Sequence, residues 1–405
     1  MSDQTMEFEE ELLATVPAFY APPGRKDRYK KLRDTYPVSF HPEVVSPFRP
    51  DGGRGWWAVT RHEDVQYVTR NPEIFSSASG TNPNDEPEVI IRALGMLHMD
   101  DPEHRLYRSI VGPSFAPRYL DALMDDLKQL SNAVIDNLLA EPEVDIATKL
   151  VNYYPIRVIC KIVGMPEEDV DKFVEWTRLA FSPDRTVGEP AHHALIDYGV
   201  KMSADRRANP QDDLISRIVA AEVDGRKLTD NEVGGFISLL VGAGAETSGA
   251  SMAFGIYNFA KQPDQWKKLQ QDPSLLGNAI DEMLRHASAV VNFRRTATRD
   301  VELGGQLIKK GDKVVMFYES ANFDERVIEN PLAFDITRDA SSQVSFGAGG
   351  PHQCLGEHLA RREMKVLFTQ MLERVESWEI TEDIKLIPSP RFNMVVGLKG
   401  AFKAK

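Results

Sequence analysis

The chain has 405 residues, of which 42% are hydrophobic, so it can bury a large core as either two domains or one large fold. Asp and Glu number 61 against 48 Lys and Arg, and the net charge of -13 disfavours nucleic acid or another polyanion as a partner. Only two cysteines occur, Cys160 and Cys354, which argues against a disulfide-based fold.

Residues 1–27 are acidic and interrupted by prolines. They contain neither the basic flank of a signal peptide nor an apolar run long enough to span a membrane, and no later segment supplies one. We therefore expect a cytoplasmic protein without a membrane anchor.

Helical periodicity dominates from about residue 100 to 285, and no repeat, low-complexity tract or flexible linker divides the sequence. We therefore predict one domain over residues 1–405, mainly α-helical with small peripheral β-sheets. Apolar spacings of three and four predict amphipathic helices over residues 120–139, 169–181 and 214–221. Apolar runs bounded by turn residues predict strands in the segments 56–60, 296–317 and 395–402. Segments 76–97 and 182–190 are rich in turn formers, which predicts mobile surface loops that could form a lid.

The longest predicted helix begins after Thr229 and ends at Lys261. Thr229 followed by Glu232 is a capping box, and Pro263 follows the other end. At 1.5 Å per residue this helix would be roughly 50 Å long and would cross the whole molecule. Its middle, residues 241–249, reads VGAGAETSG, although an interior glycine costs about 1 kcal/mol relative to alanine.

Two explanations for these glycines remain open. Small residues let neighbouring helices pack closely, or a flat ligand lies against Ala243 and Gly244. The adjacent acid and hydroxyl of Glu246 and Thr247 favour a site where a proton is delivered. A threonine hydroxyl can also bond to a carbonyl of its own helix and open the helix locally.

The two cysteines have different surroundings. Cys160 lies in the apolar run VICKIVG, which is typical of an inert buried thiol. Cys354 lies in the segment 344–360, VSFGAGGPHQCLGEHLA, where a glycine-rich loop precedes a helix. A thiolate at a helix start is stabilised by backbone N–H donors and can bind a metal axially. Zinc is disfavoured because no second cysteine is near, and a catalytic thiol with a histidine partner would leave the glycine-rich helix unexplained.

Together these segments resemble the cytochrome P-450 family, bacterial soluble class, over essentially the whole chain after about residue 40. The resemblance implies the P-450 fold, haem b as cofactor, and the Cys354 thiolate as axial iron ligand. The residues that match the family's pattern around that ligand are Phe346, Gly347, Gly349, His352, Cys354 and Gly356. The loop from Phe346 to the cysteine is one residue longer than the common pattern.

The long helix matches the family's oxygen-activating pattern at residues 243–248, AGAETS. The resemblance assigns a proton relay to Glu246 and Thr247 and places the haem against Ala243. The resemblance also places Phe346 and Gly356 beside the cofactor, on either side of the ligand.

The family's Glu-x-x-Arg pair falls on Glu282 and Arg285, one helical turn apart, with a third partner expected at Arg338. We assign this pair and its partner to a buried network that braces the haem-binding loop. The segment that follows, HASAVVNF, lacks the family's usual proline.

The haem propionates need positive partners. His104 and Arg108 are four residues apart and so face the same way on a helix. The family has a His and an Arg at this spacing and another Arg in the strand after the Glu-x-x-Arg helix, which falls on Arg295. With His352, these four groups are the expected propionate ligands.

The expected substrate-binding residues are mostly apolar, which indicates a hydrophobic substrate. They are Val241, Val290, Val291, Asn292, Phe392 and Met394. For Asn292, anchoring a substrate hydroxyl and capping backbone are equally open. The longer cysteine loop resembles that of bacterial members that oxidise steroid side chains and branched isoprenoids. This favours hydroxylation of an acyclic terpenoid alcohol such as linalool, with a steroid side chain as the alternative.

The resemblance implies a monooxygenase that uses O2 and takes electrons from NAD(P)H through a two-iron ferredoxin and its reductase. A peroxide-driven or rearranging haem-thiolate enzyme would not need the acid and threonine at 246 and 247. A haem sensor would normally join an output domain, which the sequence lacks. Basic residues that could meet the ferredoxin are Arg105, Arg108, Arg361, Arg362 and Lys365.

Overall fold

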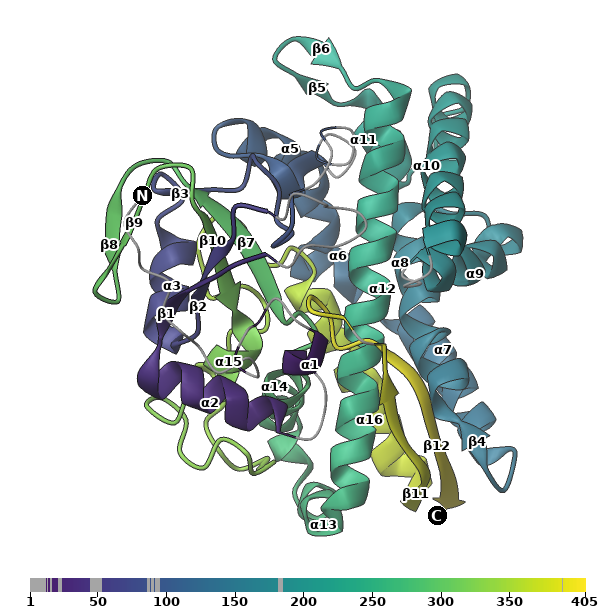
Figure 1. Cartoon of the computed structure of the whole chain (residues 1–405). Helices are drawn as coiled ribbons and strands as arrows, with labels where there is room; N and C mark the ends of the chain where they lie inside the picture. The colour runs from purple at the N-terminus through teal and green to yellow at the C-terminus, as the bar shows by residue number, and fades with distance from the viewer. Residues whose placement is uncertain are drawn as a thin grey trace.

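Helices form most of the molecule, as the sequence predicts, and one of them crosses it from end to end (Figure 1). The computed structural model describes residues 12, 14, 17–20, 24–43, 53–85, 88, 91, 95–180, 185–387 and 389–405. The helices are α1 (Pro17–Tyr20), α2 (Arg25–Thr35), α3 (His62–Arg70), α5 (Glu103–Val111), α6 (Pro117–Asp121), α7 (Met124–Leu139), α8 (Tyr154–Val163), α9 (Val170–Ala180), α10 (Arg185–Ala208), α11 (Leu214–Ala220), α12 (Asp230–Lys261), α13 (Pro263–Gln271), α14 (Leu276–Ala287), α15 (Tyr318–Asn322) and α16 (Glu357–Arg374).

The strands form small sheets at the margins of the helical body. The largest has the order β1-β2-β10-β7-β3, with only β2 and β10 parallel. A second sheet has the order β11-β12-β4, and two hairpins complete the set. The strands are β1 (Val38–His41), β2 (Trp56–Val59), β3 (Phe75–Ser76), β4 (Val144–Asp145), β5 (Glu222–Val223), β6 (Arg226–Lys227), β7 (Asn292–Ala297), β8 (Val301–Leu303), β9 (Gln306–Ile308), β10 (Lys313–Phe317), β11 (Val375–Leu386) and β12 (Val395–Ala404).

The long predicted helix is confirmed as α12. The Thr229 hydroxyl accepts the Glu232 N–H, and the Glu232 carboxylate accepts the Thr229 N–H at 2.8 Å, which completes the capping box. Close packing explains part of its glycine content. A Cβ at Gly249 would lie 2.7 Å from the Val151 carbonyl oxygen, and one at Gly255 would lie 2.3 Å from Met283 Sδ.

Most of the other predicted helices and strands are confirmed with shifted ends. The helix predicted over 120–139 is two helices, because Leu123 at φ -90°, ψ 0° separates α6 from α7. The prediction of a loop over 182–190 is wrong for residues 185–190, which begin α10 with Pro190 inside it. They are the first turns of a helix whose later part packs against α12, as at Gly199 and Gly234. Residues 182–184 and parts of 76–97 lie outside the described residues.

The sequence predicts no membrane-spanning segment, and the structure tests this prediction for helices. Among the described residues, no helix combines the length and apolar character that a bilayer span requires.

Candidate active site

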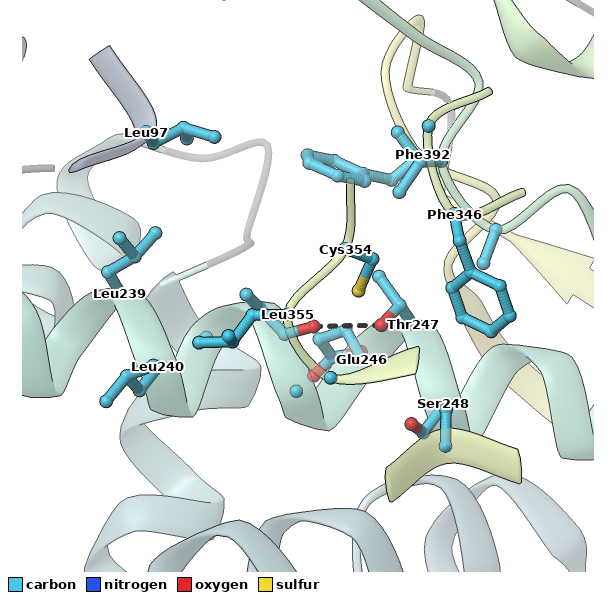
Figure 2. A pocket seen from close by; sticks show the side chains of 18 of the residues that line it. Leu97, Leu239, Leu240, Glu246, Thr247, Ser248, Phe346, Cys354, Leu355 and Phe392 are labelled. Carbon is cyan, nitrogen blue, oxygen red and sulfur yellow. Dashed lines mark hydrogen bonds between the residues drawn. The ribbon is translucent and has the colours of Figure 1, made fainter. Parts of the chain in front are cut away.

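A cavity of about 410 Å³ lies between the middle of α12 and the loop that leads into α16. Side chains from α5, α10, β7 and the segment 391–394 also line it. Figure 2 shows Glu246 and Thr247 on the α12 wall, with Cys354 on the facing loop and Phe392 above it. The cavity therefore brings together the two motifs that the sequence singled out.

Cys354 exposes its sulfur to this cavity, whereas Cys160 is fully buried in the core. Burial raises the pKa of the Cys354 thiol, and a hydrogen bond from the Gly356 backbone and the charges of Arg108 and Arg361 act in the opposite direction. Burial raises the pKa of Cys160 to about 12, so that thiol stays protonated. Cys354 alone has the surroundings of a metal-binding thiolate.

The loop before Cys354 turns through an unusual backbone path. Gly347, Ala348, Gly349 and Gly350 have φ values of 105°, 58°, 90° and 84°. A Cβ at Gly350 would lie 2.3 Å from the Thr69 carbonyl oxygen, so this position accepts only glycine. The loop closes where the Cys354 N–H donates to the Phe346 carbonyl oxygen at 2.8 Å.

Part of the α12 wall opposite Cys354 consists of small residues. Gly242, Ala243 and Gly244 line the cavity in sequence. A Cβ at Gly244 would lie 3.3 Å from Ile159, so close packing explains this glycine too. The flat ligand against Ala243 and Gly244 stays a prediction, and the small residues leave room for it.

Glu246 is a buried carboxyl that lines the cavity beside Thr247. Burial raises its pKa from the ordinary 4.5 to about 7, and the charge of Arg178 on α9 limits the rise. A carboxyl with a pKa near 7 can both give and accept a proton at neutral pH.

Basic side chains gather at one end of the cavity. The imidazoles of His104 and His352 stack with centroids 4.0 Å apart, and Arg108 and Arg295 line the cavity beside them. Burial lowers the pKa of both guanidinium groups. Neither forms an ion pair with a carboxylate in the described part of the chain.

A buried arginine, Arg295, and a half-buried one, Arg108, both without carboxylate partners in the described part of the chain, fit an acidic ligand at this position. A thiol on one wall and a flat surface of Gly and Ala on the other fit a planar group between them. These observations match the haem that the sequence predicts: Cys354 would hold the iron, and Arg108 and Arg295 would pair with the propionates.

Phe346 and Gly356 border the same cavity. The Phe346 ring lies under the Arg361 guanidinium, 4.7 Å from ring centroid to Cζ. Gly356 immediately precedes α16, where its backbone N–H reaches the thiol. Among the described residues, no cluster of three His, Cys, Asp or Glu side chains could hold another metal ion.

Glu282, Arg285 and Arg338 form the buried network that the sequence suggested. Arg285 donates from Nε to Glu282 Oε2 at 2.7 Å and from Nη2 to Oε1 at 2.8 Å. Arg338 Nε adds a third bond to Oε1 at 3.2 Å. Arg285 Nη1 donates to the Asn322 carbonyl oxygen, and the Asn322 side chain accepts the Val344 N–H at the start of the cysteine loop.

Only some of the expected substrate contacts lie at the cavity. Val290, Phe392 and Met394 line it. Val241 and Val291 face the core instead and are fully buried. Asn292 is also away from the cavity wall and donates from Nδ2 to the Pro390 carbonyl oxygen at 2.6 Å. It therefore caps backbone, which decides between the two alternatives.

Several cavity side chains were missed by the sequence predictions. Leu239 lies one helical turn before Ala243, so helical spacing could have placed it at the wall. Arg391 had only a loop as a signal, and His192 and Ser238 had none.

Comparisons with protein families, with curated proteins and with solved structures all find cytochrome P-450 proteins or monooxygenases similar to this chain. The model of the cytochrome P-450 family matches residues 165–402. A steroid C26-monooxygenase of Mycolicibacterium smegmatis is 36% identical over 355 residues, 84% of this chain and 80% of that protein. A methyl-branched lipid omega-hydroxylase of Mycobacterium tuberculosis is 34% identical over 375 residues, 89% of this chain and 86% of that protein. A Mycobacterium marinum cytochrome P-450 in complex with pseudoionone has a TM-score of 0.91 and 33% identity, and covers 95% of this chain and 97% of its own.

Proposed function

Because this chain belongs to the cytochrome P-450 family, with haem b and a cysteine thiolate, we propose that Cys354 is the iron ligand of a terminal-methyl hydroxylase. The observation that carries this proposal is the position of Cys354 across one cavity from Ala243, Glu246 and Thr247. The largest hydrophobic cluster joins residues from Met96 to Leu398, and the two smaller clusters join residues of the segment 12–75 to the segment 290–348, which supports a single domain over residues 1–405.

When bound, the haem supplies O2 activation and inserts one oxygen atom into a C–H bond, with two electrons and two protons consumed and water released. The Gly356 N–H holds charge on the Cys354 sulfur. Glu246 carries a proton at neutral pH and passes it to the cavity beside Thr247. The Thr247 hydroxyl then presents the proton at the face of α12 that is turned towards Cys354.

The proposed substrate is a methyl-branched aliphatic chain. The similarity to a steroid C26-monooxygenase and to a methyl-branched lipid omega-hydroxylase supports oxidation at a chain end. The apolar wall formed by Leu239, Val290 and Phe392 supports a hydrocarbon next to the iron. Within this class, an isoprenoid chain and a steroid side chain are the two candidates, and linalool has no specific support.

We also propose that a small ferredoxin supplies the electrons at the surface near Cys354. The charges of Arg108 on α5 and Arg361 on α16 reach the thiol, so these helices flank it. Arg105 pairs with Asp101 at 2.9 Å and Arg362 with Asp121 at 2.8 Å, which leaves the surface less positive than the sequence suggested.

Turnover tests the whole proposal. Purified holoenzyme with a ferredoxin, its reductase and NADH should convert a methyl-branched chain to the terminal alcohol, with product matching NADH consumed. The Arg105→Glu/Arg362→Glu variant should be reduced more slowly by ferredoxin but at the same rate by dithionite. Spin-state change without product would identify a binding protein, and product formed only with added peroxide would identify a different reaction type.

A further inference from the structure

Helices α10 and α12 pack side by side in opposite directions (Figure 1). Near the start of α12, Ser203 donates to the Asp230 carboxylate at 2.6 Å. Further along, a Cβ at Gly199 would lie 2.7 Å from the Gly234 Cα. Because the α10 number falls by four as the α12 number rises by four, the helices are antiparallel.

The next step of this register places Leu195 opposite Ser238. His192 lies one helical turn further along α10, opposite Val241. Both His192 and Ser238 line the active-site cavity. Two elements that are distant in sequence therefore contribute an imidazole and a hydroxyl to the cavity wall, about one helical turn apart.

These two groups have no hydrogen-bond partner within the part of the protein that the structure describes. Ser238 is only 5% exposed, and neither it nor His192 has a hydrogen-bond partner among the described residues. By contrast, Ser251 donates to the Thr247 carbonyl oxygen and Ser345 to the Leu284 carbonyl oxygen. Both side chains line the cavity, so a ligand hydroxyl or carbonyl that enters it can supply the missing hydrogen-bond partner.

Ser238 lies far from the reacting end. Ser238 and Thr247 are nine residues apart on a continuous helix, which corresponds to roughly 14 Å along its axis at 1.5 Å per residue. An extended chain advances about 3.5 Å for every three bonds, so roughly twelve bonds span this distance.

The charge at this end of the cavity is low. Burial lowers the pKa of His192, so the imidazole is neutral near pH 7 and can both donate and accept. The three arginines that line the cavity lie elsewhere: Arg108 and Arg295 near His104 and His352, and Arg391 over the rings of Phe293 and Phe392. Among the described residues that line the cavity, no cation lies beside Ser238 to pair with a carboxylate, whereas a hydroxyl or carbonyl would be satisfied.

We propose that His192 and Ser238 form a subsite for the neutral hydroxyl or carbonyl head group of an elongated, methyl-branched substrate. The inference rests on the proposed function, because it assumes that the other end of the chain lies at Cys354. It defines the substrate as an amphiphile whose polar group is about twelve bonds from the oxidised methyl group. The subsite thereby fixes which carbon reaches the iron.

Three ligands with the same branched chain test the subsite: hexahydrofarnesol, the hydrocarbon farnesane and hexahydrofarnesoic acid. Their Kd values are measured from the spin-state change of the ferric holoenzyme. Unchanged protein should bind the alcohol most tightly. His192→Phe and Ser238→Ala should each weaken alcohol binding by about 3- to 10-fold, the effect of one lost hydrogen bond. Farnesane binding should change less than about twofold, because it makes no hydrogen bond.

The neighbouring exposed His193 provides the matched control. His193→Phe makes the same replacement on the same helix turn and should leave all three Kd values unchanged. The product distribution supplies a second measurement. In His192→Phe and Ser238→Ala, oxidation should spread from the terminal methyl group to interior carbons.

Several results would overturn the subsite. One is that His192→Phe and Ser238→Ala weaken the binding of the alcohol and of the hydrocarbon equally. Another is that the unchanged protein binds the acid more tightly than the alcohol. A third is that both variants keep their Kd values but recover fewer NADH electrons as product. The last would place the pair on a proton path to Glu246. If unchanged protein responds to none of the three ligands nor to a steroid, the substrate class of the proposed function fails, and the subsite fails with it.

Discussion

The hydroxyl of Thr247 donates a hydrogen bond to the carbonyl oxygen of Ala243, 2.8 Å away, on the α12 wall that faces Cys354 (Figure 2). One turn later the Ser251 hydroxyl donates to the Thr247 carbonyl oxygen, also at 2.8 Å. These two side chains compete for carbonyls of the helix ladder at its glycine-rich centre. The Thr247 hydroxyl is therefore held at the cavity wall by the carbonyl of a residue that itself lines the cavity.

Thr247→Ala tests the role of this hydroxyl. Alanine has the higher helix propensity, so the free energy of unfolding should change by less than about 1 kcal/mol. Substrate affinity should also be kept. The share of NADH electrons recovered as product should fall by about tenfold or more, with hydrogen peroxide accounting for the loss, because positioned proton transfer is worth about 10²–10⁴ in rate. Full coupling in this variant would contradict the relay.

Glu246→Gln tests the raised pKa of the buried acid. The pKa of Glu246 is about 7 in the folded protein against an ordinary 4.5, so between these values the folded state holds a proton that the unfolded state has lost. Binding of this proton stabilises the folded state. The contribution to the free energy of unfolding is fully present below pH 4.5 and is lost as the pH rises through 7. The linkage amounts to at most about 3 kcal/mol.

The Gln variant should therefore gain stability relative to the unchanged protein at pH 8 but not at pH 5, as measured by urea unfolding at both pH values. Burial also raises the pKa of Glu363, to about 8, but both proteins carry that group and the comparison cancels it. Turnover of the unchanged protein should decline above pH 7, and a pH-independent stability difference would show that Glu246 does not titrate in this range.

The network of Glu282 and Arg285 should be structural. Arg285→Leu would leave the Glu282 carboxylate buried with only Arg338, which should cost about 3–5 kcal/mol of unfolding free energy. The exposed pair of Lys267 and Asp264 is the control, and Lys267→Ala should cost less than about 1 kcal/mol. Urea unfolding of the holoproteins measures both, and similar losses in the two variants would contradict the assignment.

Arg295→Met tests the proposed propionate site. Without haem, the replacement removes a buried cation that has no carboxylate partner, so the apoprotein should keep or gain thermal stability. With haem, dissociation of the cofactor should be about tenfold faster or more, because a charged hydrogen bond is lost.

Arg294 is the matched control, since it pairs with Asp85 at 2.8 Å rather than lining the cavity. Arg294→Met should destabilise the apoprotein and change haem dissociation little. Haem transfer to an acceptor protein and thermal melts of both apoproteins distinguish the two roles. Equal haem loss in both variants would mean that Arg295 supports the fold rather than the cofactor.

Local signals made the central elements predictable from sequence. The capping box of Thr229 and Glu232 depends on residues three apart, and the structure forms it as predicted. The contrast between Cys160 and Cys354 was likewise visible in the neighbouring residues. Strand β11 was missed although Trp378 and Ile380 alternate with charged residues.

Features set by tertiary contacts could not be predicted. Val241 has the same apolar character as Leu239, yet the rotation of α12 turns it into the core. Asn292 bonds to Pro390, nearly one hundred residues away. His192 and Ser238 line one cavity only because α10 packs against α12.

The central claim is that Cys354 is the thiolate ligand of a haem. The most direct measurement is the absorption spectrum of the reduced protein with carbon monoxide, in the unchanged protein and in Cys354→His and Cys160→Ala. The account predicts the red-shifted Soret band of thiolate-bound haem in the unchanged protein and in Cys160→Ala, and its loss in Cys354→His. The same red-shifted band in Cys354→His would contradict it.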